Sequence, residues 1–133
     1  MAQLVLDASA VVAVIAGGTS RPALIEAAKG TELLAPASLP WEVGNAIAAL
    51  LRRRCASLAE AKAAAAAYRQ IPVRLVDVDL EEVLDLSARL GIDVHDAYPL
   101  VCARAAHCPL VTLDAALAKA ARAEGIRVLE IDS

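Results

Sequence analysis

The chain has 133 residues, of which 59% are hydrophobic, so it is expected to fold as one domain covering residues 1–133 rather than to be disordered. Its formal net charge of −3 excludes a protein that holds nucleic acid through general basic charge. The apolar stretch at residues 8–20 is well short of the ~20 residues of a membrane span, and no basic region precedes it. We therefore expect a cytoplasmic protein without membrane contact.

Five short apolar runs alternate with helical patterns along the chain. The predicted strands are residues 3–6, 32–35, 73–76, 110–113 and 127–131. Such alternation is typical of an α/β fold with a parallel sheet. Because Phe is absent and aromatics make up only 2% of the chain, the core must consist mainly of aliphatic side chains.

Capping patterns mark the expected helix ends. Ser57 with Glu60 forms a capping-box pattern, and Asp79 with Glu82 forms an acidic relative of it. The glycines expected at left-handed C-terminal positions are Gly30, Gly91 and Gly125. The three cysteines lack C-x-x-C spacing and are predicted to be reduced packing residues: Cys55, Cys102 and Cys108.

Three aspartates are placed near predicted strand ends. Asp7 directly follows the first strand, Asp114 directly follows the fourth, and Asp96 is expected to open the helix leading to that fourth strand. The carboxyl ends of strands in open α/β sheets form the crevice where ligands bind. Pro99 requires that this helix begin close to His95 or Asp96, or bend.

A fourth acid, Glu42, lies in the first turns of a helix predicted over about residues 38–54. The residues that share a helix face with Glu42 are polar or small, and the mostly apolar residues lie on another face. Glu42 can therefore face a cleft while the apolar face packs on the sheet. Each of the four acids has a second interpretation as a helix cap or first-turn carboxylate. Their joint arrangement favours a functional site.

Four segments carry a family resemblance that spans nearly the whole chain. They are LVLDASA at residues 4–10, LPWEVGNA at 39–46, DAY at 96–98 and LVTLD at 110–114. In this order and spacing the chain resembles PIN-domain ribonucleases, particularly the VapC-type toxins of toxin–antitoxin pairs. The resemblance implies a three-layer α/β/α sandwich with a five-stranded parallel sheet ordered 3-2-1-4-5. Strands one and four then lie adjacent, which places Asp7 beside Asp114.

The resemblance also implies a metal-dependent endoribonuclease that acts as a toxin, forms a homodimer and binds an antitoxin protein. Its catalytic and metal-binding residues would be Asp7, Glu42, Asp96 and Asp114. Clustered carboxylates repel one another unless a cation neutralises them, and ligation by oxygen alone favours Mg²⁺ or Mn²⁺. Since Mg²⁺ accepts one or two carboxylates directly, we expect Asp7 and Asp96 to bind it. Glu42 and Asp114 would bind a second ion or orient waters.

Further side chains are candidates for contact with RNA. Ser9 and Thr112 could hold a water or ligand beside the acids, although Ser9 could instead bond only its local backbone. Cationic candidates for phosphate contact, or alternatively solvated helix-end residues, are Arg52, Arg53, Arg54, Arg104, Lys119 and Arg122. His95 and His107 are expected at the surface or at helix ends. Trp41 could stack a base, or fill the core or a dimer interface.

Other classes of protein fit this pattern less well. A response-regulator receiver domain would need an acidic pair after the first strand, whereas Asp7 stands alone there, and no Walker-type or G-x-G-x-x-G loop is present. The remaining alternative is a catalytically silent PIN-like module that acts only by binding a partner protein. Retention of all four acids argues against it.

Overall fold

The computed structural model describes residues 2–131. In chain order the elements are β1 (Ala2–Leu6), α1 (Ala8–Ile15), α2 (Arg21–Ala28), β2 (Thr31–Pro36), α3 (Leu39–Arg52), α4 (Leu58–Arg69), β3 (Val73–Val76), α5 (Leu80–Leu90), α6 (Val94–Ala106), β4 (Leu110–Val111) and α7 (Ala115–Ala123). None of the helices in this described part is long and apolar enough to cross a membrane.

The sheet has four parallel strands in the order β3-β2-β1-β4, which confirms the predicted neighbours of the first four strands. The predicted fifth strand is reduced to a single parallel bridge between Leu110 and Val128. The predicted fourth strand is also too long, because β4 ends at Val111. Beyond Val111 the chain turns, and the Thr112 hydroxyl accepts a hydrogen bond from the Asp114 N–H at 3.0 Å.

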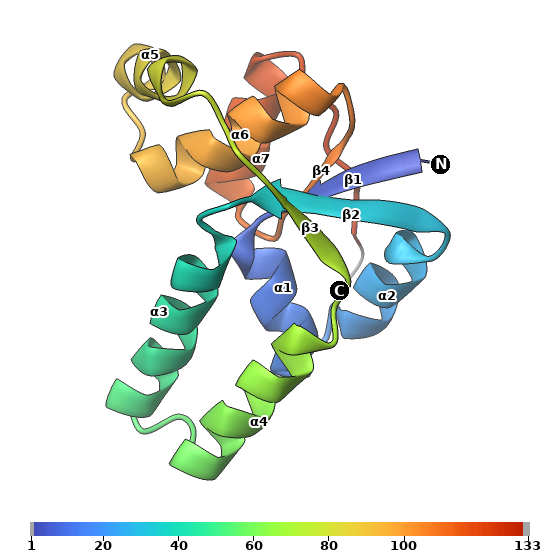
Figure 1. Ribbon diagram of the computed structural model, residues 1–133, viewed down its shortest axis with the longest axis vertical. Coiled ribbons are helices and arrows are strands. Elements are labelled where there is room, and N and C mark those ends of the chain that lie inside the picture. Colours follow the sequence, from blue (N-terminus) through green and yellow to red (C-terminus); the bar gives the residue numbers. More distant parts are fainter. Residues whose placement is uncertain (1, 132–133) are drawn as a thin grey trace.

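Helices cover both faces of the sheet and complete the expected three layers (Figure 1). One face packs against α5, α6 and α7, with Val5 and Leu34 in a core that includes Leu100. The other packs against α1, α2 and α3 through the alternate strand residues, such as Leu4 and Leu33. Successive strand side chains point to opposite faces, so the apolar runs supply both cores.

The local predictions of helix ends are largely confirmed. The Ser57 hydroxyl accepts from the Glu60 N–H at 3.1 Å, and the Ser57 N–H donates to Glu60 Oε1 at 2.9 Å. Asp79 differs, because its carboxylate accepts from the Glu81 N–H at 2.9 Å rather than forming a reciprocal pair with Glu82. The three glycines expected to be left-handed have φ values of 72°, 66° and 74°, for Gly30, Gly91 and Gly125 respectively.

The cysteines are all free, as expected. Cys102 is buried and Cys108 half-buried, in agreement with a packing role. The same expectation was wrong for Cys55, which is exposed. This residue follows α3 where the chain reverses into α4, and the two helices form an arm that projects from the body of the molecule (Figure 1).

Candidate active site

Asp7 lies at the junction of β1 and α1, and its side chain is buried, with an exposure of 8% for the residue. Its Oδ1 accepts from the Ser9 hydroxyl at 2.7 Å and from the Ala10 N–H at 3.1 Å, while Oδ2 accepts from the Thr112 hydroxyl at 2.6 Å. Burial raises the pKa of Asp7 against the effect of these bonds, and the charge of Asp114 raises it further. Asp7 is therefore a helix cap and also a buried carboxylate facing another acid.

Ser9 and Thr112 connect the start of α1 with the loop after β4. Besides donating to Asp7, the Ser9 oxygen accepts from the Leu113 N–H at 3.0 Å. Thr112 is buried and accepts from the Asp114 N–H. Both hydroxyls hold the Asp7 carboxylate in place, and Ser9 does not bond only its local backbone. Their contact with a water or ligand stays a prediction.

Asp114 is exposed and caps α7, since its Oδ1 accepts from the Leu117 N–H at 3.1 Å. Because β4 is short, Asp114 follows the strand after a turn instead of directly. The parallel pairing of β1 with β4 still brings it close enough for its charge to act on Asp7. The capping interpretation thus holds for both of these aspartates and is compatible with a shared site.

Glu42 enters the site from the first turn of α3, with its side chain 15% exposed. Its Oε1 lies 3.5 Å from the donating Ser38 hydroxyl and 3.4 Å from His95 Nδ1. Burial raises the pKa of Glu42, the charge of Asp7 adds to this rise, and His95 opposes it. His95 was expected only as a surface or helix-end residue. It is largely exposed, but its contact with Glu42 makes it part of the site.

Asp96 lies in the first turn of α6, which begins at Val94 with Asp93 at its N-cap. The helix therefore starts slightly earlier than predicted and contains Pro99, which is buried. Burial raises the pKa of Asp96, and the charges of Asp114 and Asp93 raise it further. The charge of Asp114 thus acts on Asp96 despite the proline.

The four carboxylates form a connected series rather than a tight cage. The charge of Asp7 raises the pKa of Glu42, and the charge of Asp114 raises the pKa values of both Asp7 and Asp96. Within residues 2–131 no group of three or more acidic, His or Cys side chains converges closely enough to hold an ion. The all-oxygen donor set nevertheless fits Mg²⁺, which takes one or two carboxylates and keeps several waters.

Three of the cationic candidates lie away from these acids or are paired with another acid. Arg52 is exposed at the end of α3, about 15 Å along the helix from Glu42 at 1.5 Å per residue. Arg104 lies 3.6 Å from Glu124, and Arg122 lies 2.8 Å from Glu130. For Arg104 and Arg122 these ion pairs favour the structural interpretation over the predicted contact with RNA.

Comparisons with known proteins agree with this architecture. The sequence matches the PIN domain family model over residues 4–123, and the chain belongs to this family. A search of curated proteins finds no match.

Several solved structures share the fold. VapBC2 from Rickettsia felis, bound to a DNA fragment from its promoter, gives a TM-score of 0.71 at 14% identity, covering 98% of this chain and 99% of that one. PAE2754 from Pyrobaculum aerophilum gives 0.68 at 24% identity, covering 90% and 86%. The sarcin–ricin loop cleaving toxin VapC20 from Mycobacterium tuberculosis gives 0.66 at 20% identity, covering 96% and 98%.

Proposed function

We propose that the protein is a metal-dependent endoribonuclease that cleaves RNA phosphodiester bonds as the toxin of a toxin–antitoxin pair. The observation that carries this proposal is the buried Asp7 carboxylate, which lies beside Asp114 and Glu42 at the carboxyl edge of the sheet. Membership of the PIN domain family supports a nuclease. The similarity in fold to VapBC2 and to the RNA-cleaving toxin VapC20 supports the toxin assignment.

Mg²⁺ is the proposed cofactor, with Mn²⁺ as an alternative. Asp7 and Asp96 would hold it directly, and Glu42 and Asp114 would bind a second ion or orient waters. When bound, such an ion supplies the positive charge that draws a phosphate to an acidic site and lowers the pKa of water. A bound ion would therefore explain how a protein with a net charge of −3 can act on a polyanion.

The chain's own groups would prepare the site for this chemistry. Ser9 and Thr112 fix both Asp7 oxygens, so the carboxylate is oriented before substrate arrives. Glu42 has a raised pKa and is positioned by Ser38 and His95, which suits it to accept a proton from an attacking water.

The expected partners follow from the same assignment. RNA would be the substrate, an antitoxin protein would inhibit the site, and two copies of the chain would form a homodimer in the cytoplasm. The competing function is that of a catalytically silent module which binds a partner protein. Static light scattering tests the homodimer, and a metal-dependent cleavage assay separates the two functions.

The decisive experiment compares the purified wild type with Asp7→Asn and Asp96→Asn on single-stranded RNA with Mg²⁺ or Mn²⁺. We expect each substitution to reduce cleavage by about 100-fold or more, as does loss of a group that acts in the transition state. Asp85→Asn, at an exposed acid on α5, is the matched control and should retain activity. Circular dichroism checks that each variant is folded. Equal cleavage by both site variants, or equal cleavage in EDTA, would exclude the proposed mechanism.

A further inference from the structure

A hollow of about 410 Å³ opens next to Ser38, which contacts Glu42. It is lined by Ala37, Ser38, Trp41, Asp77, Val78 and Tyr98. Ala37 directly follows β2 and Asp77 directly follows β3, so the hollow lies at the same carboxyl edge of the parallel sheet as Asp7. Its volume is within the range of small-ligand sites.

Aromatic side chains are concentrated in this hollow. The chain contains one Trp, two Tyr and no Phe, and Trp41 and Tyr98 both line it. Trp41 is 74% exposed, which shows that the expected core role is wrong for this residue. A Trp is highly buried on average, so this exposed indole is available to a ligand.

The hollow adjoins the carboxylate series at Ser38, while the four acids themselves do not line it. Ser38 lines the hollow and also donates its hydroxyl to Glu42 at 3.5 Å. Trp41 immediately precedes Glu42 on α3, and Tyr98 lies two residues after Asp96 on α6, so each aromatic side chain leaves its helix next to an acid but on a different face. A nucleic-acid strand with one phosphate at the carboxylates would therefore bring a neighbouring nucleotide to the hollow.

The residues that line the hollow favour the base of that nucleotide over its phosphate. The exposed carboxylate of Asp77 disfavours a phosphate and can accept a hydrogen bond from an N–H group of a base edge. Aromatic faces bind unpaired bases by stacking, with little dependence on sequence. We propose that Trp41 and Tyr98 form a stacking subsite for one unpaired nucleobase next to the phosphate bound at the carboxylates. This proposal rests on the ribonuclease function above.

Trp41 can be used to test the subsite because it is the only Trp of the chain and therefore the sole source of tryptophan fluorescence. The wild-type protein is titrated in Mg²⁺ with adenosine 3′- and 5′-monophosphate, which contain no phosphodiester bond to cleave. Ribose 5-phosphate is the matched ligand without a base. We expect both nucleotides to quench the fluorescence and ribose 5-phosphate to leave it unchanged.

Variants then separate stacking from apolar burial. Binding of the fluorescent nucleotide ethenoadenosine monophosphate is measured by anisotropy for the wild type, Trp41→Phe and Trp41→Leu. Trp41→Leu should weaken binding by roughly 5- to 100-fold, the factor that corresponds to one lost base stack, while Trp41→Phe should retain most of the affinity. Leu84→Ala, which removes another exposed apolar side chain, is the control and should bind like the wild type.

Three outcomes would overturn the subsite: no quenching by nucleotides, equal quenching by ribose 5-phosphate, or equal binding by Trp41→Leu. Fluorescence that depends on protein concentration but not on nucleotide would assign Trp41 to a contact between copies, which also overturns it. A cleavage assay on the same preparation distinguishes the two proposals. Cleavage without quenching leaves the nuclease proposal intact and removes only the subsite.

Discussion

Asp7 is the residue on which most of the site depends. Its carboxylate is buried, yet both oxygens receive hydroxyl donors, from Ser9 and Thr112. A buried charge requires such partners, because burial without them costs several kcal/mol. The bond from Thr112 also connects two segments that are far apart in the chain. Site geometry and stability are therefore coupled at this residue.

Replacing Thr112 by Val tests this coupling. The substitution keeps the shape but removes the donor to Asp7 Oδ2 and the acceptor for the Asp114 N–H. We expect a loss of roughly 1.5–3 kcal/mol in the free energy of unfolding, as for a hydrogen bond to a charged group, together with reduced RNA cleavage. Urea denaturation measures the first effect. Thr19→Val, at an exposed threonine, is the control, and an equal change in both variants would contradict the argument.

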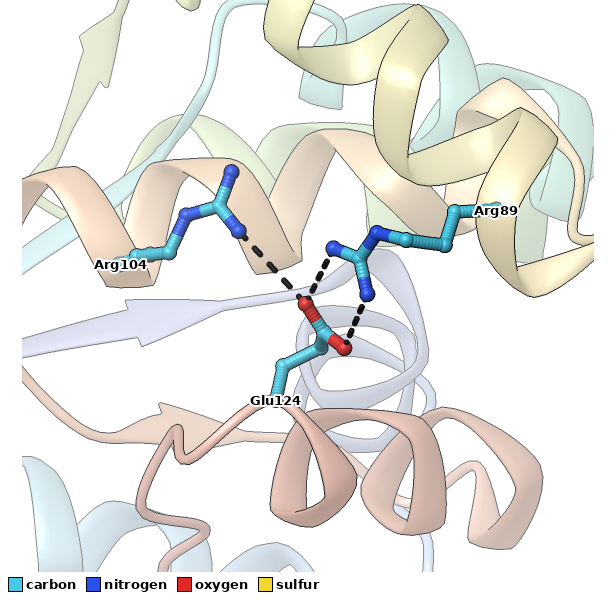
Figure 2. A network of polar contacts seen from close by, with 3 residues as sticks. All are labelled: Arg89, Arg104 and Glu124. Carbon is cyan, nitrogen blue, oxygen red and sulfur yellow. Dashed lines mark hydrogen bonds and ion pairs between the residues drawn. The ribbon is translucent and has the colours of Figure 1, made fainter.

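At the scale of elements, one acid joins three helices on one face of the sheet. Glu124, at the C-cap of α7, accepts from Arg89 of α5 through two bonds of 2.8 and 2.6 Å and lies 3.6 Å from Arg104 of α6 (Figure 2). The Glu124 side chain is only 11% exposed. Because its geometry is bidentate, this Arg–carboxylate pair should contribute more to stability than a typical surface ion pair does.

The pH dependence of stability should reflect this network. The bonds from Arg89 lower the pKa of Glu124 below its ordinary value of 4.5. Its contribution to stability is therefore fully present above that value and is lost as the pH falls through the lowered folded pKa. Glu124→Gln should lower the unfolding temperature by a few degrees at pH 7, and the difference from wild type should shrink in acid.

Thermal unfolding followed by circular dichroism at a series of pH values measures this difference. Glu26→Gln removes the acid of a more exposed ion pair, with Lys29 at 2.9 Å, and serves as the control. It should change the unfolding temperature less than Glu124→Gln does. A Glu124→Gln effect that is constant from neutral to acidic pH would show that the charge of Glu124 is not responsible.

At the scale of the whole molecule, the arm formed by α3 and α4 extends the protein away from the carboxylates (Figure 1). Arg52 lies on this arm about 15 Å from Glu42, so both cannot contact the same phosphate. If Arg52 binds RNA, it does so at a nucleotide distant from the cleaved bond. Such a contact acts through phosphate charge and requires a substrate long enough to reach it.

Arg52→Ser should therefore weaken binding of long RNA and reduce the slope of affinity against salt concentration by about 1, while leaving very short substrates unaffected. Filter binding at several salt concentrations measures the slope. Arg127→Ser removes an exposed cation just before the single bridge at Val128 and is the control. An unchanged slope in Arg52→Ser would show that Arg52 does not contact RNA and is only a solvated residue at the helix end.

The sequence by itself determined the features that depend on neighbouring residues. Apolar runs identified the four strands of the sheet, and the capping box at Ser57 and the left-handed glycines are present as predicted. Contacts between residues a few positions apart recur wherever the same pattern occurs, so local chemistry suffices. The position of Asp7 and Asp114 after two strands, together with the strand order implied by the family resemblance, likewise predicted that these two acids lie near each other.

Only the tertiary structure decided which distant groups meet. It paired His95 with Glu42, directed the Thr112 hydroxyl to Asp7, exposed Trp41, and left a single bridge in place of a fifth strand. None of these follows from spacing, because each depends on how separate elements pack. Helix and strand periodicity states which face a residue occupies, whereas the packing of the three layers sets what that face contacts.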